Sequence, residues 1–181
     1  RHTVTWDPNQ DIANTAAQNG QGQLLDQKFR LGAKVLAKMG LSFDAWLYFP
    51  QLPELADFAR AVPDLTIVLN HIGGLLRTGP YAFRDDEVIR EWKYGISEVA
   101  QCPNVFVKLG GIGQPRTGYD WHARTNPIGS EELSATMSPF MNYCIEQFTP
   151  ERCMFESNFP PDKVGYSYNV LFNAFKRLSV D

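Results

Sequence analysis

The stretch LTIVLNHIGG, residues 65–74, places a histidine and two glycines directly after a short apolar run. A continuous apolar run of four to eight residues is typical of a strand buried on both faces of a parallel sheet. We therefore expect residues 65–70 to form such a strand, with His71 at its carboxyl end. This one segment predicts both the kind of sheet and the position of a reactive side chain.

Strand and helix patterns alternate outward from this segment in both directions. Further strands are expected over residues 1–5, 43–48, 104–109 and 152–156, and helices over residues 24–39, 52–62, 85–101, 131–148 and 163–178. Ser130 is expected to cap the fourth of these helices. No hairpin signal separates the strands, and this alternation predicts a parallel sheet with helices outside it.

Two architectures fit this alternation, a doubly wound open sheet and a (β/α)8 barrel. A doubly wound sheet usually carries a glycine-rich turn after its first strand, whereas here that strand runs into Trp6-Asp7-Pro8. A barrel concentrates its chemistry at the carboxyl ends of its strands. Polar residues follow several of the predicted strands: Asp7, Gln51, His71, Lys108 and Asn158. We therefore expect an α/β fold of the TIM-barrel type.

Chain length suggests that this barrel is incomplete. A TIM barrel takes about 250 residues, and this chain has 181 and opens inside a predicted strand. We expect residues 1–181 to form a single barrel domain that lacks its N-terminal strands.

Composition and charge exclude several classes of function. The chain is 44% hydrophobic and 20% charged, with a net charge of -3, which is ordinary for a soluble globular domain. It has no basic stripe that would bind nucleic acid and no apolar run of about 18 residues that would span a membrane. Its three cysteines show no metal-type spacing and indicate a reducing cytoplasm. We expect a cytoplasmic protein with a small-molecule substrate; a homo-oligomer is left open.

His71 is the strongest candidate for chemistry. Histidine exchanges a proton near neutral pH or binds a metal, and the glycines beside it allow a ligand to approach the backbone closely. The structural alternative is that the imidazole only hydrogen-bonds a neighbouring carbonyl group.

Two further strand ends carry polar candidates. Glu156 and Asn158 follow the last strand in MFESNFP, residues 154–160, and Lys108 ends the strand before it in KLGGIG, residues 108–113. Lys108 is expected to bind an anionic group or to pair with Glu156, and Asn158 to orient a substrate or a water molecule. The alternatives are a capped polar strand end and a solvated lysine.

The long loop between residues 110 and 129 supplies the remaining basic candidates. Long loops in compact domains are often functional. This one contains His122 and two arginines, Arg116 and Arg124, which suit the acid group of a substrate. Asp7 and Tyr48, near the ends of two other strands, complete the substrate-binding candidates. A plain surface loop is the alternative interpretation of the segment.

Several of these segments together resemble a known family. The segments are FDAWLYFPQLPELADFARAVPDLTIVLNHIGG (residues 43–74), NVFVKLGG (104–111), ERCMFESNFPPDK (151–163) and YNVLFNAFKRL (168–178). They resemble the amidohydrolase-related family of 2-pyrone-4,6-dicarboxylate hydrolases and sugar lactonases, which has metal-dependent decarboxylases as cousins. The resemblance covers nearly the whole chain and implies that it corresponds to strands four to eight of the barrel.

The resemblance also implies roles for individual residues. His71 matches the histidine that polarises the substrate or activates water at the end of strand six. Asn158 stands where many members have an aspartate that binds metal or acts as a general base, and Phe49 stands near the place of a strand-five histidine. Glu156 lies two residues before Asn158 on the same side of the strand and is a substitute for that aspartate.

These two departures weaken the metal site, because phenylalanine cannot bind a metal and a neutral amide is a weak ligand. We expect no cofactor, unless a His-x-His pair upstream of Arg1 restores a zinc or manganese site near His71 and Asn158.

The leading hypothesis is a hydrolase that opens a small carboxylated or sugar-derived lactone by cleaving a C–O bond. His71, Asn158 and Glu156 would be its catalytic residues. The alternatives are a metal-dependent decarboxylase, which is a lyase, and a catalytically degenerate barrel retained for binding.

Overall fold

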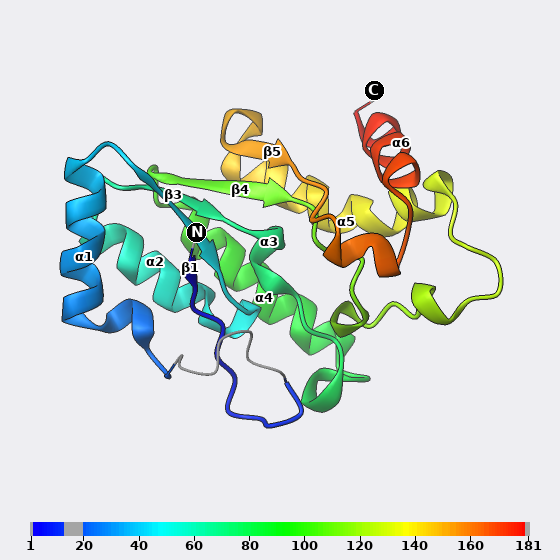
Figure 1. Ribbon diagram of the computed structural model, residues 1–181, viewed down its shortest axis with the longest axis horizontal. Coiled ribbons are helices and arrows are strands. Elements are labelled where there is room, and N and C mark those ends of the chain that lie inside the picture. The colour runs from blue at the N-terminus through cyan, green and yellow to red at the C-terminus, as the bar shows by residue number, and fades with distance from the viewer. Residues whose placement is uncertain (1, 13–19, 180–181) are drawn as a thin grey trace.

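A computed structural model describes residues 2–12 and 20–179 of the chain. Its centre is one parallel sheet in which the strands follow one another in sequence order, as the alternating pattern predicted. The strands are β1 (His2–Thr3), β2 (Ser42–Trp46), β3 (Thr66–Leu69), β4 (Val105–Leu109) and β5 (Cys153–Phe155). All five predicted strands are confirmed, and each is shorter than expected because pairing stops where the chain turns away from the sheet (Figure 1).

Helices cover one face of this sheet (Figure 1). They are α1 (Gln27–Lys38), α2 (Leu52–Ala61), α4 (Asp85–Ala100), α5 (Ser130–Phe148) and α6 (Tyr168–Leu178). In β4 the residues Val105, Val107 and Leu109 are buried beneath the helices, whereas Phe106 and Lys108 alternate with them and are only half-buried. The opposite face therefore corresponds to the inside of a barrel, where the strand ends carry polar side chains.

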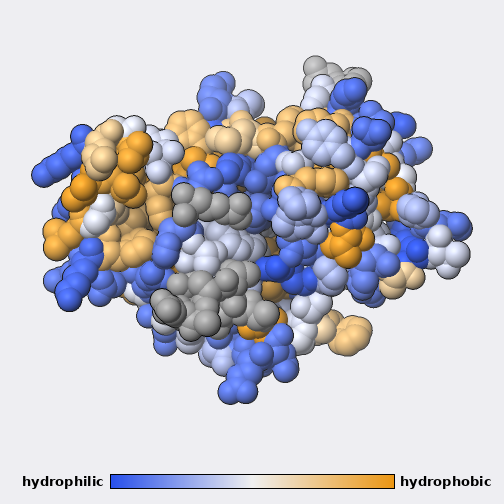
Figure 2. Space-filling model, viewed as in Figure 1, coloured by the Kyte–Doolittle hydropathy of each residue, from blue (hydrophilic) through white to orange (hydrophobic). Residues whose placement is uncertain are grey.

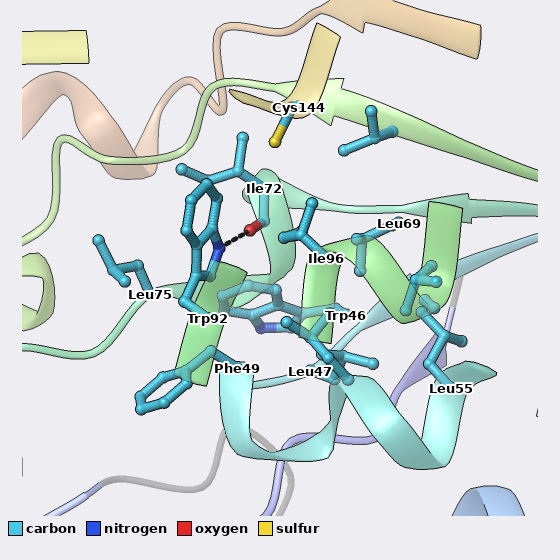
Figure 3. Close-up of a cluster of buried hydrophobic side chains, with 14 of the residues drawn as sticks. Trp46, Leu47, Phe49, Leu55, Leu69, Ile72, Leu75, Trp92, Ile96 and Cys144 are labelled. Atoms are coloured by element: carbon cyan, nitrogen blue, oxygen red, sulfur yellow. Dashed lines mark hydrogen bonds between the residues drawn. The ribbon is translucent and has the colours of Figure 1, made fainter. Parts of the chain in front are cut away.

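The core lies between the helices and the sheet. Figure 3 shows side chains from the end of β2 and from β3, α2 and α4 packed together, among them Leu55, Leu69 and Ile96, with Leu47, which follows β2. These four side chains are wholly buried. Burial of each such side chain stabilises the fold by about 1.5–3 kcal/mol, so this layer fixes the strand ends from which the candidate site is built.

Two of the predicted helices need correction. The helix expected over residues 24–39 is a short 3₁₀ turn, Gln23–Leu25, followed by α1, because Asp26 caps α1 through a hydrogen bond from the amide of Phe29. The last helix is likewise split into a 3₁₀ segment, Pro161–Val164, and α6.

Ser130 is the first residue of α5 and does not cap it, since the residue at the cap position is Gly129. The Ser130 hydroxyl instead accepts a hydrogen bond from Nε of Arg177 in α6. The cap prediction was therefore one residue out of place.

Apolar side chains gather on the surface over α1 (Figure 2). The exposed apolar residues there include Leu31 and Val35 of α1 and Met39 at its C-terminal cap, spaced four residues apart. Across residues 2–12 and 20–179, none of the helices combines the length and the apolar character that a membrane crossing requires.

Candidate active site

The chain makes a left-handed turn directly after β3. Four consecutive residues have positive φ angles: His71 (56°), Ile72 (47°), Gly73 (79°) and Gly74 (62°). Glycine tolerates this region without cost, but a β-branched residue such as Ile72 is strained there. Strained backbone persists only where the surroundings hold it, and it concentrates at functional sites.

The two glycines of the turn are required by close packing. A Cβ atom on Gly74 would lie 2.0 Å from the carbonyl oxygen of Leu47, and one on Gly73 would lie 2.9 Å from the side chain of Leu52. No larger residue fits at Gly74 without moving the backbone. The HIGG sequence thus encodes a turn pressed tightly against the end of β2.

Glu156 holds the imidazole that this turn presents. One carboxylate oxygen, Oε1, accepts hydrogen bonds from the backbone amide of His71 at 2.8 Å and from its Nδ1 at 2.5 Å. His71 is only 4% exposed and the Glu156 side chain 13%. A carboxylate on Nδ1 fixes both the tautomer and the orientation of a histidine ring.

Trp46 and Gly111 also lie against the imidazole. The edge of the Trp46 ring system meets the His71 ring with centroids 4.6 Å apart. A Cβ atom on Gly111, whose φ is 76°, would lie 2.5 Å from the His71 side chain. The glycine pair of KLGGIG therefore allows the loop after β4 to lie against the histidine.

Lys108 does not pair with Glu156, which corrects one prediction. Its Nζ lies 2.6 Å from Oδ2 of Asp44 in β2, and both side chains remain about one-quarter exposed on the barrel-side face. Lys108 pairs in register with Met154 of β5, two residues before Glu156, which follows that strand. The lysine is therefore tied to a carboxylate other than Glu156.

Asn158 follows β5 as predicted and contacts Asp162 rather than His71. Its φ is 49°, and its Nδ2 donates to Oδ1 of Asp162 at 2.7 Å. Asp162 is fully buried and also accepts from the amide of Gly113, from Gln114 and from the Tyr166 hydroxyl. Burial raises the pKa of Asp162, and the hydrogen bonds from these donors partly oppose that rise. This cluster joins the loops after β4 and β5.

Tyr48 and Asp7 are both buried near the ends of β2 and β1. The Tyr48 hydroxyl lies 3.5 Å from the guanidinium of Arg116, and burial raises the pKa of Tyr48. Asp7 accepts a hydrogen bond of 2.6 Å from the hydroxyl of Tyr81, and the pKa of Tyr81 is raised, first by burial and then by this bond.

His122 and Arg124 line a separate groove of about 590 Å³ beside the start of α6. Aromatic rings form much of its wall, and Lys163 adds a third basic side chain; His71, Lys108 and Glu156 are not part of that lining. Arg124 also pairs with Glu132 at 2.7 Å. The structure therefore separates these two loop residues from Lys108, with which they had been grouped.

Sequence reasoning missed three contributors to the site. Only the structure shows their place: Trp46 against the imidazole, Trp92 behind the turn, and buried Asp162. Arg116, an arginine of the long loop expected to bind an acid group, lies with its guanidinium 5.6 Å over the Trp46 ring. Asp162 had a local signal, as one of the acids in the quoted segment 151–163. Trp46 and Trp92 are ordinary residues of a strand and a helix.

The residues of the described chain do not fit a metal site by themselves. Within residues 2–12 and 20–179 no group of three or more His, Cys, Asp or Glu side chains converges as metal ligands would. His71 Nδ1 and Glu156 Oε1 are bonded to each other. Cys102 and Cys144 are buried and Cys153 is half-buried, as expected for packing residues.

Comparison with known proteins places this geometry in context. The sequence model of the amidohydrolase family matches residues 14–180. The uncharacterized protein y4mH of Sinorhizobium fredii is 36% identical over 153 residues, which make up 84% of this chain and 45% of that protein. The L-fucono-1,5-lactonase of Burkholderia multivorans is 25% identical over 153 residues, 84% of this chain and 48% of that enzyme.

A solved structure shares the fold. An amidohydrolase from Burkholderia multivorans, crystallised with bound zinc, superposes with a TM-score of 0.71 at 23% identity over 86% of this chain and 50% of that one. The chain thus spans about half the length of the relatives it matches. The parallel sheet with helices on one face is part of a TIM barrel, and the chain belongs to the amidohydrolase family.

Proposed function

We propose that this chain carries the histidine half of the active site of a hydrolase that opens a small carboxylated or sugar-derived lactone. One observation carries the proposal: Glu156, from the end of β5, holds the Nδ1 of His71, from the end of β3. A carboxylate–histidine pair at the carboxyl ends of barrel strands suits proton transfer to and from a reacting oxygen.

In the proposed reaction, Nε2 of His71 takes a proton from water as its oxygen attacks the lactone carbonyl. The tetrahedral intermediate then collapses, the ring C–O bond breaks, and the imidazolium returns the proton to the departing alkoxide. Glu156 stabilises the imidazolium between these two steps, as a buried carboxylate does for a histidine base. The product is a hydroxy acid, and His71 ends in its starting state.

Asn158 is assigned a supporting role in this scheme. Its amide nitrogen is bonded to Asp162, which leaves the amide oxygen to orient the attacking water. Tyr48, Asp7 and Lys108 are assigned to the substrate-facing side of the barrel.

Recognition of an acid group is assigned to the groove that contains His122, Arg124 and Lys163. The described residues that line the groove include basic and aromatic side chains and no carboxylate. Aromatic faces suit the ring of a sugar or pyrone, and an arginine fork suits a carboxylate. The groove therefore suits the acid-bearing part of the substrate, while the reacting carbonyl is assigned to His71.

The named relative supports the C–O bond as the target, since that enzyme is an L-fucono-1,5-lactonase. The test is a pH-stat assay of the complete natural polypeptide against a panel of sugar lactones and pyrone carboxylates. We expect acid release by the wild type and a loss of at least a hundredfold in His71→Ala. His2→Ala, which removes an exposed histidine elsewhere, is the matched control and should retain activity.

Two results would contradict this proposal. One is an absence of acid release across the panel, and the other is equal turnover in His71→Ala and the wild type.

A metal-dependent decarboxylase is the second candidate, favoured by the zinc in the superposed amidohydrolase. Metal analysis of the complete polypeptide together with a carbon dioxide assay separates the two functions. Stoichiometric zinc or manganese with CO₂ release would favour the lyase. Ligand binding without turnover, unaffected by His71→Ala, would instead favour a barrel retained for binding.

A further inference from the structure

Trp92 makes a polar contact that links a core helix to the strained turn. It lies in α4 and is wholly buried, and its indole Nε1 donates a hydrogen bond of 2.7 Å to the carbonyl oxygen of Ile72 (Figure 3). Ile72 follows His71 directly and has a φ of 47°. The indole therefore binds the backbone of the turn at its most strained residue.

The position of the indole is fixed independently of the turn. Its ring contacts Phe140 and Tyr143 of α5 at centroid separations of 5.4 Å and 5.6 Å. A buried ring that packs against two aromatic neighbours has little freedom to rotate. The hydrogen bond consequently sets the direction of the Ile72 carbonyl relative to α4 and α5. The carbonyl does not set the position of the indole.

The direction of that carbonyl affects the imidazole. A left-handed conformation at an isoleucine is unfavourable by itself, so the backbone would relax towards negative φ without a partner for this carbonyl. Relaxation at Ile72 rotates the adjoining peptide of His71. The two hydrogen bonds that His71 gives to Glu156 need both its backbone amide and its ring in their present places.

We propose that Trp92 is a positioning residue for His71: its indole N–H holds the left-handed turn that brings the imidazole to Glu156. The indole does not contact the reacting atoms and acts only through the backbone of Ile72. The catalytic part of this inference rests on the proposed function, whereas the effect on the His71–Glu156 hydrogen bond does not.

The test replaces Trp92 in the complete polypeptide with 3-benzothienylalanine, which keeps the ring shape and exchanges the N–H for sulfur. Trp92→Phe is the genetically encoded version. Tyr143→Phe is the matched control. It removes the hydroxyl of Tyr143 in α5, which donates a hydrogen bond to the carbonyl oxygen of Lys93 in α4, and it leaves the turn untouched.

Two readouts follow the position of the imidazole. The first is the downfield proton resonance of His71 Nδ1, assigned by its loss in His71→Asn. We expect it to broaden or disappear in both Trp92 variants and to persist in Tyr143→Phe. The second is lactone hydrolysis, where kcat should fall about tenfold to a hundredfold with KM little changed, since misplacement of a catalytic group by about 1 Å has effects of that size.

A rescue experiment separates positioning from simple loss of core packing. Glycine adopts a left-handed φ without cost, so Ile72→Gly in the Trp92→Phe background should restore the Nδ1 resonance and part of kcat. If Trp92 were only a packing residue, Ile72→Gly would remove a second buried side chain. The intensity of the Nδ1 resonance and kcat would then both fall further.

The inference is overturned if the His71 resonance is unchanged in folded Trp92 variants, or if Ile72→Gly deepens the defect. The Nδ1 resonance tests the positioning role of Trp92 whether or not any lactone is hydrolysed. A failure of the proposed function would show separately, as inactivity of the wild type.

Discussion

A single oxygen of Glu156 accepts both the backbone amide and the imidazole Nδ1 of His71, at 2.8 Å and 2.5 Å. The carboxylate thus fixes the turn that carries the histidine and the ring itself. Because Glu156 follows β5 and His71 follows β3, the contact also joins two strand ends across the intervening β4. The proposed hydrolase chemistry depends on this relationship.

Replacement of Glu156 by glutamine should separate the effect of the negative charge of this side chain from the effect of its shape. The amide oxygen of Glu156→Gln can accept one or both hydrogen bonds, but it cannot stabilise an imidazolium by charge. We expect kcat to fall about a hundredfold with the fold retained, since removal of the carboxylate behind a catalytic histidine has effects of this order or more. Steady-state kinetics beside a circular dichroism melt tests this, and unchanged kcat would remove Glu156 from the mechanism.

Gly111→Ala should damage the site by overpacking. The new Cβ would lie 2.5 Å from the His71 side chain at a φ of 76°. We expect the free energy of unfolding to fall by about 2 kcal/mol or more, with a large loss of activity. Gly32→Ala is the control, because a methyl group on this residue of α1 would meet no described atom within 4 Å. That variant should gain roughly 0.5–1 kcal/mol, as urea unfolding of both would measure.

Asn70→Leu should stabilise the protein. Asn70 is wholly buried, and neither Nδ2 nor Oδ1 of its side chain has a hydrogen-bond partner among the described residues. A buried amide without partners is costly, and leucine has a similar size without polar atoms. We expect the free energy of unfolding to rise by roughly 1 kcal/mol. A lower melting temperature would show that the amide makes a stabilising contact.

Glu54 predicts a particular dependence of stability on pH. Burial raises the pKa of this α2 carboxyl above its usual value near 4.5, and its Oε2 has no partner within the described part of the chain. The folded state therefore binds this proton more tightly than the unfolded state, so the contribution of Glu54 is present below the unfolded pKa. That contribution is lost as the pH rises through the folded pKa.

Glu54→Gln should abolish that loss. Relative to the wild type, the free energy of unfolding of Glu54→Gln should be higher at pH 7 than at pH 4. Chemical denaturation of both proteins at the two pH values measures this difference. An equal difference at both pH values would mean that Glu54 titrates alike in the folded and unfolded chains.

The sequence predicted the strands, the parallel sheet and the placing of His71 and Glu156, because hydrophobic periodicity and strand ends are local properties. It did not predict which partners these side chains choose. Lys108 and Glu156 end neighbouring strands, but the register sets Lys108 opposite Met154 and within reach of Asp44. The glycines of HIGG indicate a tight turn. Trp92, which holds this turn, lies 20 residues after Ile72 in an ordinary helical pattern, so the sequence contains no sign of its role.

The most direct test is a crystal structure of the complete polypeptide with a lactone analogue or the product hydroxy acid bound. The proposed function predicts that the carbonyl or carboxylate oxygen derived from the lactone lies roughly 3 Å from Nε2 of His71, with Nδ1 still bonded to Glu156. A ligand bound elsewhere in the barrel, with the imidazole still enclosed and untouched, would contradict it.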